Sequence, residues 1–140
     1  MTTFYGYFKE NMEALGLPAP ESLFGTLQTA VGNAAIFVTH IDRYGTRITV
    51  GELIGAGTRL EKLGTVATLS AAFYVGAVIG SIAVATGRTL SGGTSIADVL
   101  LMARQQGLHR AWLVTALRRW PGTYREVPGR RAYRLLTVGP

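Results

Sequence analysis

Between Lys62 and Arg88 the chain reads LGTVATLSAAFYVGAVIGSIAVATG (residues 63–87), twenty-five residues without a charged side chain and without proline. A helix rises about 1.5 Å per residue, so this stretch would extend on the order of 36 Å. The hydrocarbon core of a bilayer is about 30 Å thick. The stretch therefore predicts one apolar helix that is long enough to cross a membrane.

Small residues recur at every fourth position of this stretch, and on a helix they would form one stripe: Gly64, Thr68, Ala72, Gly76 and Gly80. The last two make a GxxxG pair, a pattern that allows a second helix to approach closely. In water, each glycine inside a helix costs up to about 1 kcal/mol relative to alanine, so the helix needs a compensating partner. Two interpretations follow: a membrane-inserted helix, which we favour, and the central helix of a water-soluble protein.

Helical patterns also precede this stretch. The opening FYGYFKENMEALG predicts a short helix that ends at Gly16, before the Pro18/Pro20 break. Apolar residues at intervals of three and four predict an amphipathic helix from Ser22 to Ile41. We expect a compact form of the protein in which residues 63–86 pack against that helix.

The C-terminal third predicts two helices and a hairpin. Ser95 is a suitable N-cap, with Asp98 in the first turn, and residues 108–120 form a second helical pattern. Two short strands are expected at residues 124–127 and 132–138. The predicted fold class is mainly α: a small helical protein with one potential membrane-inserting glycine-zipper helix and a short C-terminal β-hairpin. The expected single domain, 1–140, has an amphipathic helical part (1–62), a membrane-inserting segment (63–88) and a basic C-terminal part (89–140).

Composition excludes several classes of protein. With 48% hydrophobic and 16% charged residues and a mean hydropathy of +0.25, the 140-residue chain is neither disordered nor collagen-like. The absence of cysteine excludes disulfides, thiolate metal sites and a cysteine nucleophile. The first sixteen residues lack a basic start and a continuous apolar run, so no cleaved secretory leader is expected.

Catalytic and metal-binding patterns are weak. His40 and Asp42 would place two ligands together, but a metal site needs three or four donors, so no metal is expected. No serine or histidine signature of a hydrolase is present. Gly51, Gly55 and Gly57 lack the lysine and serine or threonine that end a phosphate-binding loop. We therefore expect neither an enzyme nor a cofactor.

The net charge of +6 is concentrated at the C-terminal end, where eight arginines after Thr89 face only Asp98 and Glu126. Arginine favours bidentate contact with carboxylate or phosphate. The expected membrane-surface or anion-binding residues are Arg110, Arg118, Arg119, Arg130 and Arg131. Their order is also typical of a winged helix-turn-helix, with Arg130 and Arg131 at the tip of the wing, which would make this part a nucleic-acid-binding module.

A leaderless, cysteine-free, basic chain with this small-residue stripe resembles the small glycine-zipper effectors of the bacterial type VI secretion system. The likeness rests on Gly64, Thr68, Ala72, Gly76 and Gly80, with Gly51 and Gly55 as a preceding zipper. It implies an antibacterial toxin that forms ion-conducting pores in the inner membrane of a competing bacterium and dissipates its membrane potential.

The resemblance also implies partners and a location. Such effectors travel in the lumen of the Hcp ring, self-associate in the target bilayer, and are neutralised in the producing cell by a membrane-located immunity protein. Export without a leader and action at the recipient's inner membrane are therefore expected. Two alternatives remain beside the toxin: the nucleic-acid-binding module, and a single-span membrane scaffold whose arginine-rich end stays cytoplasmic.

Overall fold

A computed structural model describes residues 3–57, 61–87 and 94–135. These residues form seven α-helices and three 3-10 helices, and they contain no strand beyond an isolated bridge between Thr49 and Ser70. The α-helices are α1 (Phe4–Ala14), α2 (Glu21–Phe24), α3 (Leu27–Tyr44), α4 (Val50–Gly55), α5 (Ala71–Gly87), α6 (Ile96–Gln105) and α7 (Ala111–Arg119). The 3-10 helices are η1 (Glu61–Val66), η2 (Pro121–Thr123) and η3 (Arg130–Leu135). The prediction of a mainly α protein is confirmed.

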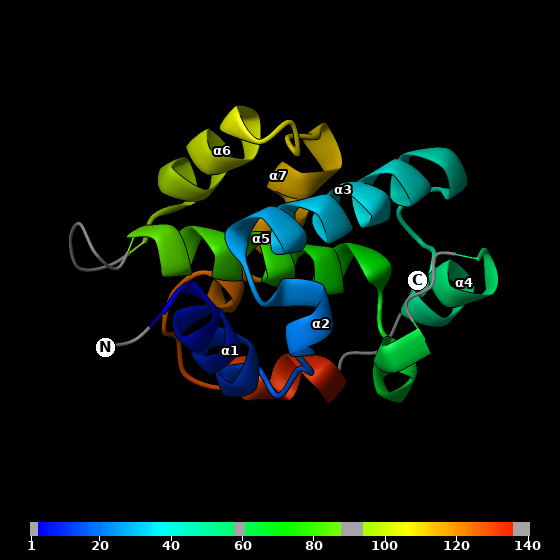
Figure 1. Cartoon of the computed structure of the whole chain (residues 1–140), viewed down its shortest axis with the longest axis horizontal. Coiled ribbons are helices and arrows are strands. Elements are labelled where there is room, and N and C mark those ends of the chain that lie inside the picture. Colours follow the sequence, from blue (N-terminus) through cyan, green and yellow to red (C-terminus); the bar gives the residue numbers. More distant parts are fainter. Residues whose placement is uncertain (1–2, 58–60, 88–93, 136–140) are drawn as a thin grey trace.

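Helix α5 runs through the middle of the molecule, and the other helices surround it (Figure 1). Helices α1 and α3 make the most extensive contacts with it, and α6, α7 and η2 cover its remaining sides. Every residue from Ala71 to Ala85 is buried. The expected packing of the apolar segment on the amphipathic helix is confirmed for α5 and α3.

Several helix ends follow local sequence signals. Gly16 and Gly107 have φ angles of 75° and 72°, and each ends a helix in the left-handed conformation that glycine adopts readily. Ser95 and Asp98 form a reciprocal capping box at the start of α6, which confirms the predicted N-cap. The helix predicted from Ser22 to Ile41 is divided at Gly25, because Thr26 caps a new helix by accepting a hydrogen bond from the Thr29 amide.

The prediction of one continuous glycine-zipper helix over residues 63–87 is wrong. Residues 63–66 belong to η1, and α5 begins only at Ala71. The segment before α5 instead pairs with the start of α4: the Val50 amide donates to the Leu69 carbonyl and the Gly51 amide to the Ala67 carbonyl, at 3.0 and 2.9 Å. Ser70 then accepts a hydrogen bond from the Phe73 amide and acts as the N-cap of α5.

The predicted β-hairpin is also wrong. Residues 124–127 form no strand, and the described part of the second expected strand lies in η3. Residues 136–138 of that strand lie outside the described residues. The chain turns at Gly129 (φ 76°), and η3 follows below α1 in Figure 1. Arg131 of η3 donates a hydrogen bond to the Glu13 carbonyl of α1.

In the described ranges, no helix combines the length and the apolar character that a membrane crossing requires. Helix α5 is the most apolar, but it has only 17 residues.

Candidate functional site

The candidate functional site is α5 together with the contacts that enclose it. Gly76 faces α7, where a Cβ atom added to it would lie 3.8 Å from the Ala116 Cβ. Gly80 faces η2 much more closely, since an added Cβ would lie only 2.5 Å from the Thr123 carbonyl oxygen. The GxxxG pair therefore does permit close approach, but the partner is the C-terminal part of the same chain.

A buried polar cluster joins α1, α5 and η2 beside Gly80. Asn11, which is 2% exposed, donates through its Nδ2 to the Ser81 hydroxyl at 2.8 Å and to the Thr123 carbonyl at 2.9 Å. The Asn11 Oδ1 accepts a hydrogen bond from Arg130 at 3.3 Å. Buried polar groups are costly unless they are hydrogen-bonded, so this cluster fixes how the three elements meet on α5.

Aromatic side chains hold the first turn of α5. The Phe73 ring packs against Trp120 and Tyr133, with centroid separations of 5.1 and 6.0 Å. The Tyr74 hydroxyl donates to the Pro18 carbonyl at 2.7 Å, and burial raises the pKa of Tyr74 well above its usual range. Tyr74 therefore stays neutral, which suits an uncharged helix surrounded by apolar groups.

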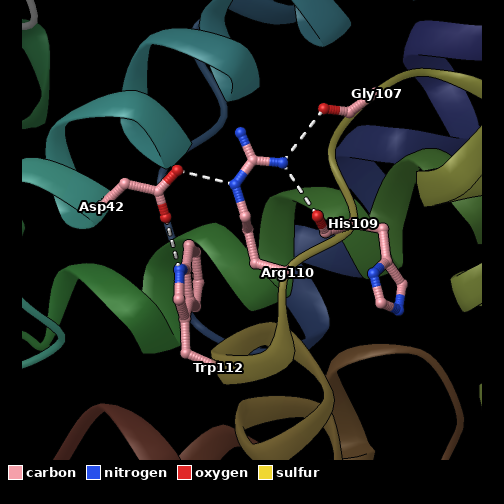
Figure 2. Close-up of polar contacts among 5 residues, drawn as sticks. All are labelled: Asp42, Gly107, His109, Arg110 and Trp112. Carbon is pink, nitrogen blue, oxygen red and sulfur yellow. Dashed lines mark hydrogen bonds and ion pairs between the residues drawn. The ribbon is translucent and has the colours of Figure 1, made fainter.

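A clamp on the surface connects two of the covering helices. Asp42 near the end of α3 accepts a hydrogen bond from the Arg110 Nε at 2.6 Å and one from the Trp112 indole at 2.9 Å (Figure 2). Arg110 also donates to the carbonyl oxygens of Gly107 and His109. The Asp42–Arg110–Trp112 clamp thus fastens α7 to α3 on either side of α5.

The ionisation of Asp42 is coupled to this clamp. Partial burial works against the charged form, but the hydrogen bonds from Trp112 and Arg110 and the charge of Arg110 outweigh it and hold the pKa of Asp42 below its usual range. A carboxylate whose pKa is lowered by folding stabilises the folded state above its unfolded pKa. That contribution is lost as the pH falls through the lowered value.

Replacing Asp42 with asparagine is expected to lower the unfolding free energy near neutral pH by less than about 1 kcal/mol, because the pair is solvent-exposed and screened. As the pH falls through the lowered pKa of Asp42, the two proteins should become equally stable, since Asp42 is then protonated. Urea unfolding at a series of pH values measures this difference, with Arg110→Gln as the matched change on the other side of the pair. A difference that persists unchanged into strong acid would contradict the clamp.

The structure separates the residues of the predicted zipper. Gly76, Gly80 and Ala72 lie in α5 and are buried, whereas Gly64 lies in η1 and Thr68 in the turn before α5, and both are exposed. Gly64 has no atom within 4 Å of an added Cβ. The five residues therefore do not form one stripe in this structure, because Ser70 starts a new helix between them.

The five predicted anion-binding arginines have different surroundings in the structure. Arg110 is paired with Asp42, and Arg119 lies over the Trp120 ring at 4.7 Å. Arg130 and Arg131 donate to groups of α1 instead of forming the tip of a wing. Arg118 is exposed. Because the predicted hairpin is wrong, the predicted wing is wrong too. Nucleic-acid binding itself stays a prediction, and retardation of duplex DNA at low salt would test it.

The two histidines are placed apart from each other. His40 Nδ1 lies 2.9 Å from the Ile36 carbonyl, and its ring stacks on Tyr44. The imidazole of His109 points away from the Asp42 carboxylate (Figure 2). In the part of the chain that the structure describes, no three histidine or acidic residues gather as metal ligands would.

Sequence reasoning missed Asn11, Ser70 and the role of Asp42. Ser70 had a usable signal, because it is an N-cap residue directly before an apolar run. Asn11 and Asp42 had none, since their partners lie 70 or 112 residues away in the first case and 68 or 70 in the second. Comparison of the chain with models of protein families, with curated proteins and with solved structures finds no match.

Proposed function

We propose that this protein acts on membranes: the compact fold is a storage form, and release of α5 lets it insert into a bilayer and contribute to an ion-conducting pore. The observation that carries the proposal is that α5 is uncharged and buried on all sides. Helices that are apolar all round belong to the cores of large proteins or to membranes.

The enclosure of α5 is compatible with release. The surrounding helices α1, α3 and α6 cover α5 with their buried faces and carry polar residues on their outer faces, so they keep α5 out of water. Lipid tails satisfy an uncharged helix as well as a protein core does, because the backbone groups between its two ends bond within the helix. Transfer of α5 from this core to a bilayer therefore leaves no charge in hydrocarbon.

Length requires one further change. Seventeen residues of α5 extend about 26 Å, which is less than the roughly 30 Å of a hydrocarbon core. Residues 63–70 carry no charge either, and their conversion to α-helix would extend α5 enough to span. Only in this extended helix would Gly64 and Thr68 lie on the same face as Gly76 and Gly80. That face would mediate self-association between copies of the protein.

The resemblance to glycine-zipper effectors supplies the biological setting of the proposal. The protein would be an antibacterial toxin, carried in the Hcp ring, that dissipates the membrane potential of a recipient cell. A membrane-located immunity protein would protect the producer. Expression directed to the periplasm should collapse the potential reported by a voltage-sensitive dye, and expression confined to the cytoplasm should not. Equal effects from both compartments would contradict entry from the outer side of the inner membrane.

A disulfide lock tests release of α5 directly. The chain has no cysteine, and the 3.8 Å between the Ala116 Cβ and a Cβ added to Gly76 matches the usual Cβ separation of about 3.8 Å in a disulfide. Oxidised Gly76→Cys/Ala116→Cys protein keeps α5 fastened to α7, so we expect it to release no dye from vesicles. Reduction should restore release to the level of the unmodified protein.

The controls use the same chain. The two single-cysteine variants should release dye equally under oxidising and reducing conditions, since neither can form the lock. Thermal unfolding of the oxidised double variant shows that it is folded. Undiminished release by the oxidised, folded double variant would overturn the proposal that α5 leaves α7.

A further inference from the structure

The segment after η2 closes over the Gly80 side of the core as a strap, which we define as residues 125–133. An added Cβ on Gly122 would lie 2.6 Å from the Arg130 Cβ, 2.8 Å from Tyr133 Cε2 and 3.0 Å from Val127 Cγ2, so the strap lies directly on η2. The Tyr133 ring also covers Phe73 at the start of α5. Opening the strap would thus uncover contacts that hold α5.

Among the described residues, Arg130 and Arg131 of the strap donate to neutral acceptors only. Arg130 Nη1 donates to Asn11 Oδ1 and to the carbonyl oxygens of Gly122 and Arg125, at 3.3, 3.4 and 3.1 Å. Arg131 donates to the Glu13 carbonyl at 3.2 Å. Bonds of arginine to carboxylate or phosphate, in which both partners are charged, are shorter, about 2.7–2.9 Å.

Arg110 shows the contrast within the same molecule. Its guanidinium is held by the Asp42 carboxylate at 2.6 Å. No carboxylate lies within ion-pair distance of Arg130 or Arg131 in the described residues. A phosphate group would therefore exchange more favourably with the strap arginines than with the clamp.

We propose that the strap is a phosphate-sensing latch: Arg130 and Arg131 leave their carbonyl partners for the phosphates of an anionic membrane surface, and the strap opens to free α5. This proposal rests on the proposed function and adds its trigger. A membrane surface favours the exchange because it concentrates phosphates and attracts arginine, whereas dissolved phosphate is dilute. Loss of the Arg130 bond also weakens the Asn11 cluster, which joins the strap to α1 and α5.

The readout is the ratio of dye release from vesicles of phosphatidylglycerol and phosphatidylcholine in equal parts to release from phosphatidylcholine alone. The wild-type ratio should be high. In Arg130→Gln/Arg131→Gln it should fall to about one, because the sensing groups are absent. Arg47→Gln/Arg104→Gln removes the same charge from exposed side chains outside the strap and should keep the wild-type ratio. Equal ratios in the two double variants would overturn the latch.

Gly122→Ala tests the latch in the opposite direction. The added methyl group pushes Arg130, Tyr133 and Val127 away, so the strap should open without anionic lipid. Overpacking of this kind should shift the equilibrium between the closed and the open strap by at least about fivefold, so release from phosphatidylcholine vesicles should rise by that factor. A folded Gly122→Ala protein with wild-type release would overturn the role of the strap.

Two further arms separate the sources of phosphate and the two proposals. Inorganic phosphate at the same dilute concentration as the lipid phosphate, added with phosphatidylcholine vesicles, should not cause release, and release there would overturn the assignment to a lipid surface. Phosphate at a much higher concentration and matched ionic strength should shift the wild type, but not Arg130→Gln/Arg131→Gln, toward the open strap, which is measured as faster amide hydrogen exchange of residues 125–133. If no vesicle leaks but this shift occurs, the latch is supported and the pore proposal fails. If no vesicle leaks and the shift does not occur, both proposals fail.

Discussion

Replacing Gly80 with alanine is expected to lower the unfolding free energy by about 2–4 kcal/mol, since the new methyl group meets backbone instead of a flexible side chain. The added Cβ would lie 2.5 Å from the Thr123 carbonyl oxygen and 3.0 Å from its carbon. Thr123 cannot retreat freely, because its carbonyl accepts the Asn11 hydrogen bond. Urea unfolding followed by circular dichroism measures the loss.

The other zipper glycines provide matched controls. Gly76→Ala places its Cβ in ordinary contact with Ala116 and should gain up to about 1 kcal/mol from the better helix propensity of alanine. Gly64→Ala meets nothing within 4 Å and should stay within about 0.5 kcal/mol of the wild type. Similar losses in all three variants would contradict the close contact of Gly80 with η2.

Replacing Asn11 with alanine should cost about 3 kcal/mol, because it leaves buried partners on two other elements without their hydrogen bonds. The Ser81 hydroxyl and the Thr123 carbonyl lose the amide donor, and Arg130 loses an acceptor. The same substitution should loosen the strap and expose the part of the core that it covers, so thermal unfolding should begin at a lower temperature.

Two comparisons make this result specific. Ser81→Ala removes only one bond of the cluster and should cost about 1 kcal/mol. Lys9→Ala changes an exposed residue of the same helix and should alter stability by less than about 0.5 kcal/mol. An Asn11→Ala variant as stable as Lys9→Ala would show that the cluster contributes nothing to the fold.

Local signals in the sequence predicted most of the helices. The periodicity of residues 22–41, the glycine at position 16 and the Ser95–Asp98 pair act over a few residues, and the structure contains the corresponding helix, helix end and cap. The apolar character of residues 71–85 was likewise sufficient to predict burial. These features depend on neighbours in the chain, so tertiary contacts are not needed to anticipate them.

The predicted hairpin is wrong because the surroundings of these residues depend on contacts that are distant in the sequence. Residues 124–135 alternate enough to suit strands, but a strand needs a partner for its backbone groups. Here, Arg130 and Arg131 reach carbonyl groups of η2, the strap and α1 instead. Contacts with α1 are separated by more than 100 residues, and a sequence pattern carries no information about them.

The sequence by itself determined that this protein is helical and that an uncharged segment near its middle avoids water, because helix periodicity and side-chain polarity are local properties. Only the tertiary structure decided where that segment breaks and what its glycines face. Hydrogen bonds between residues 67–71 and residues 48–51 place the N-cap of α5 at Ser70. The Thr123 carbonyl packs closely against Gly80. An apolar helix is stable in a protein core and in a bilayer alike, so its actual surroundings depend on the helices that fold around it.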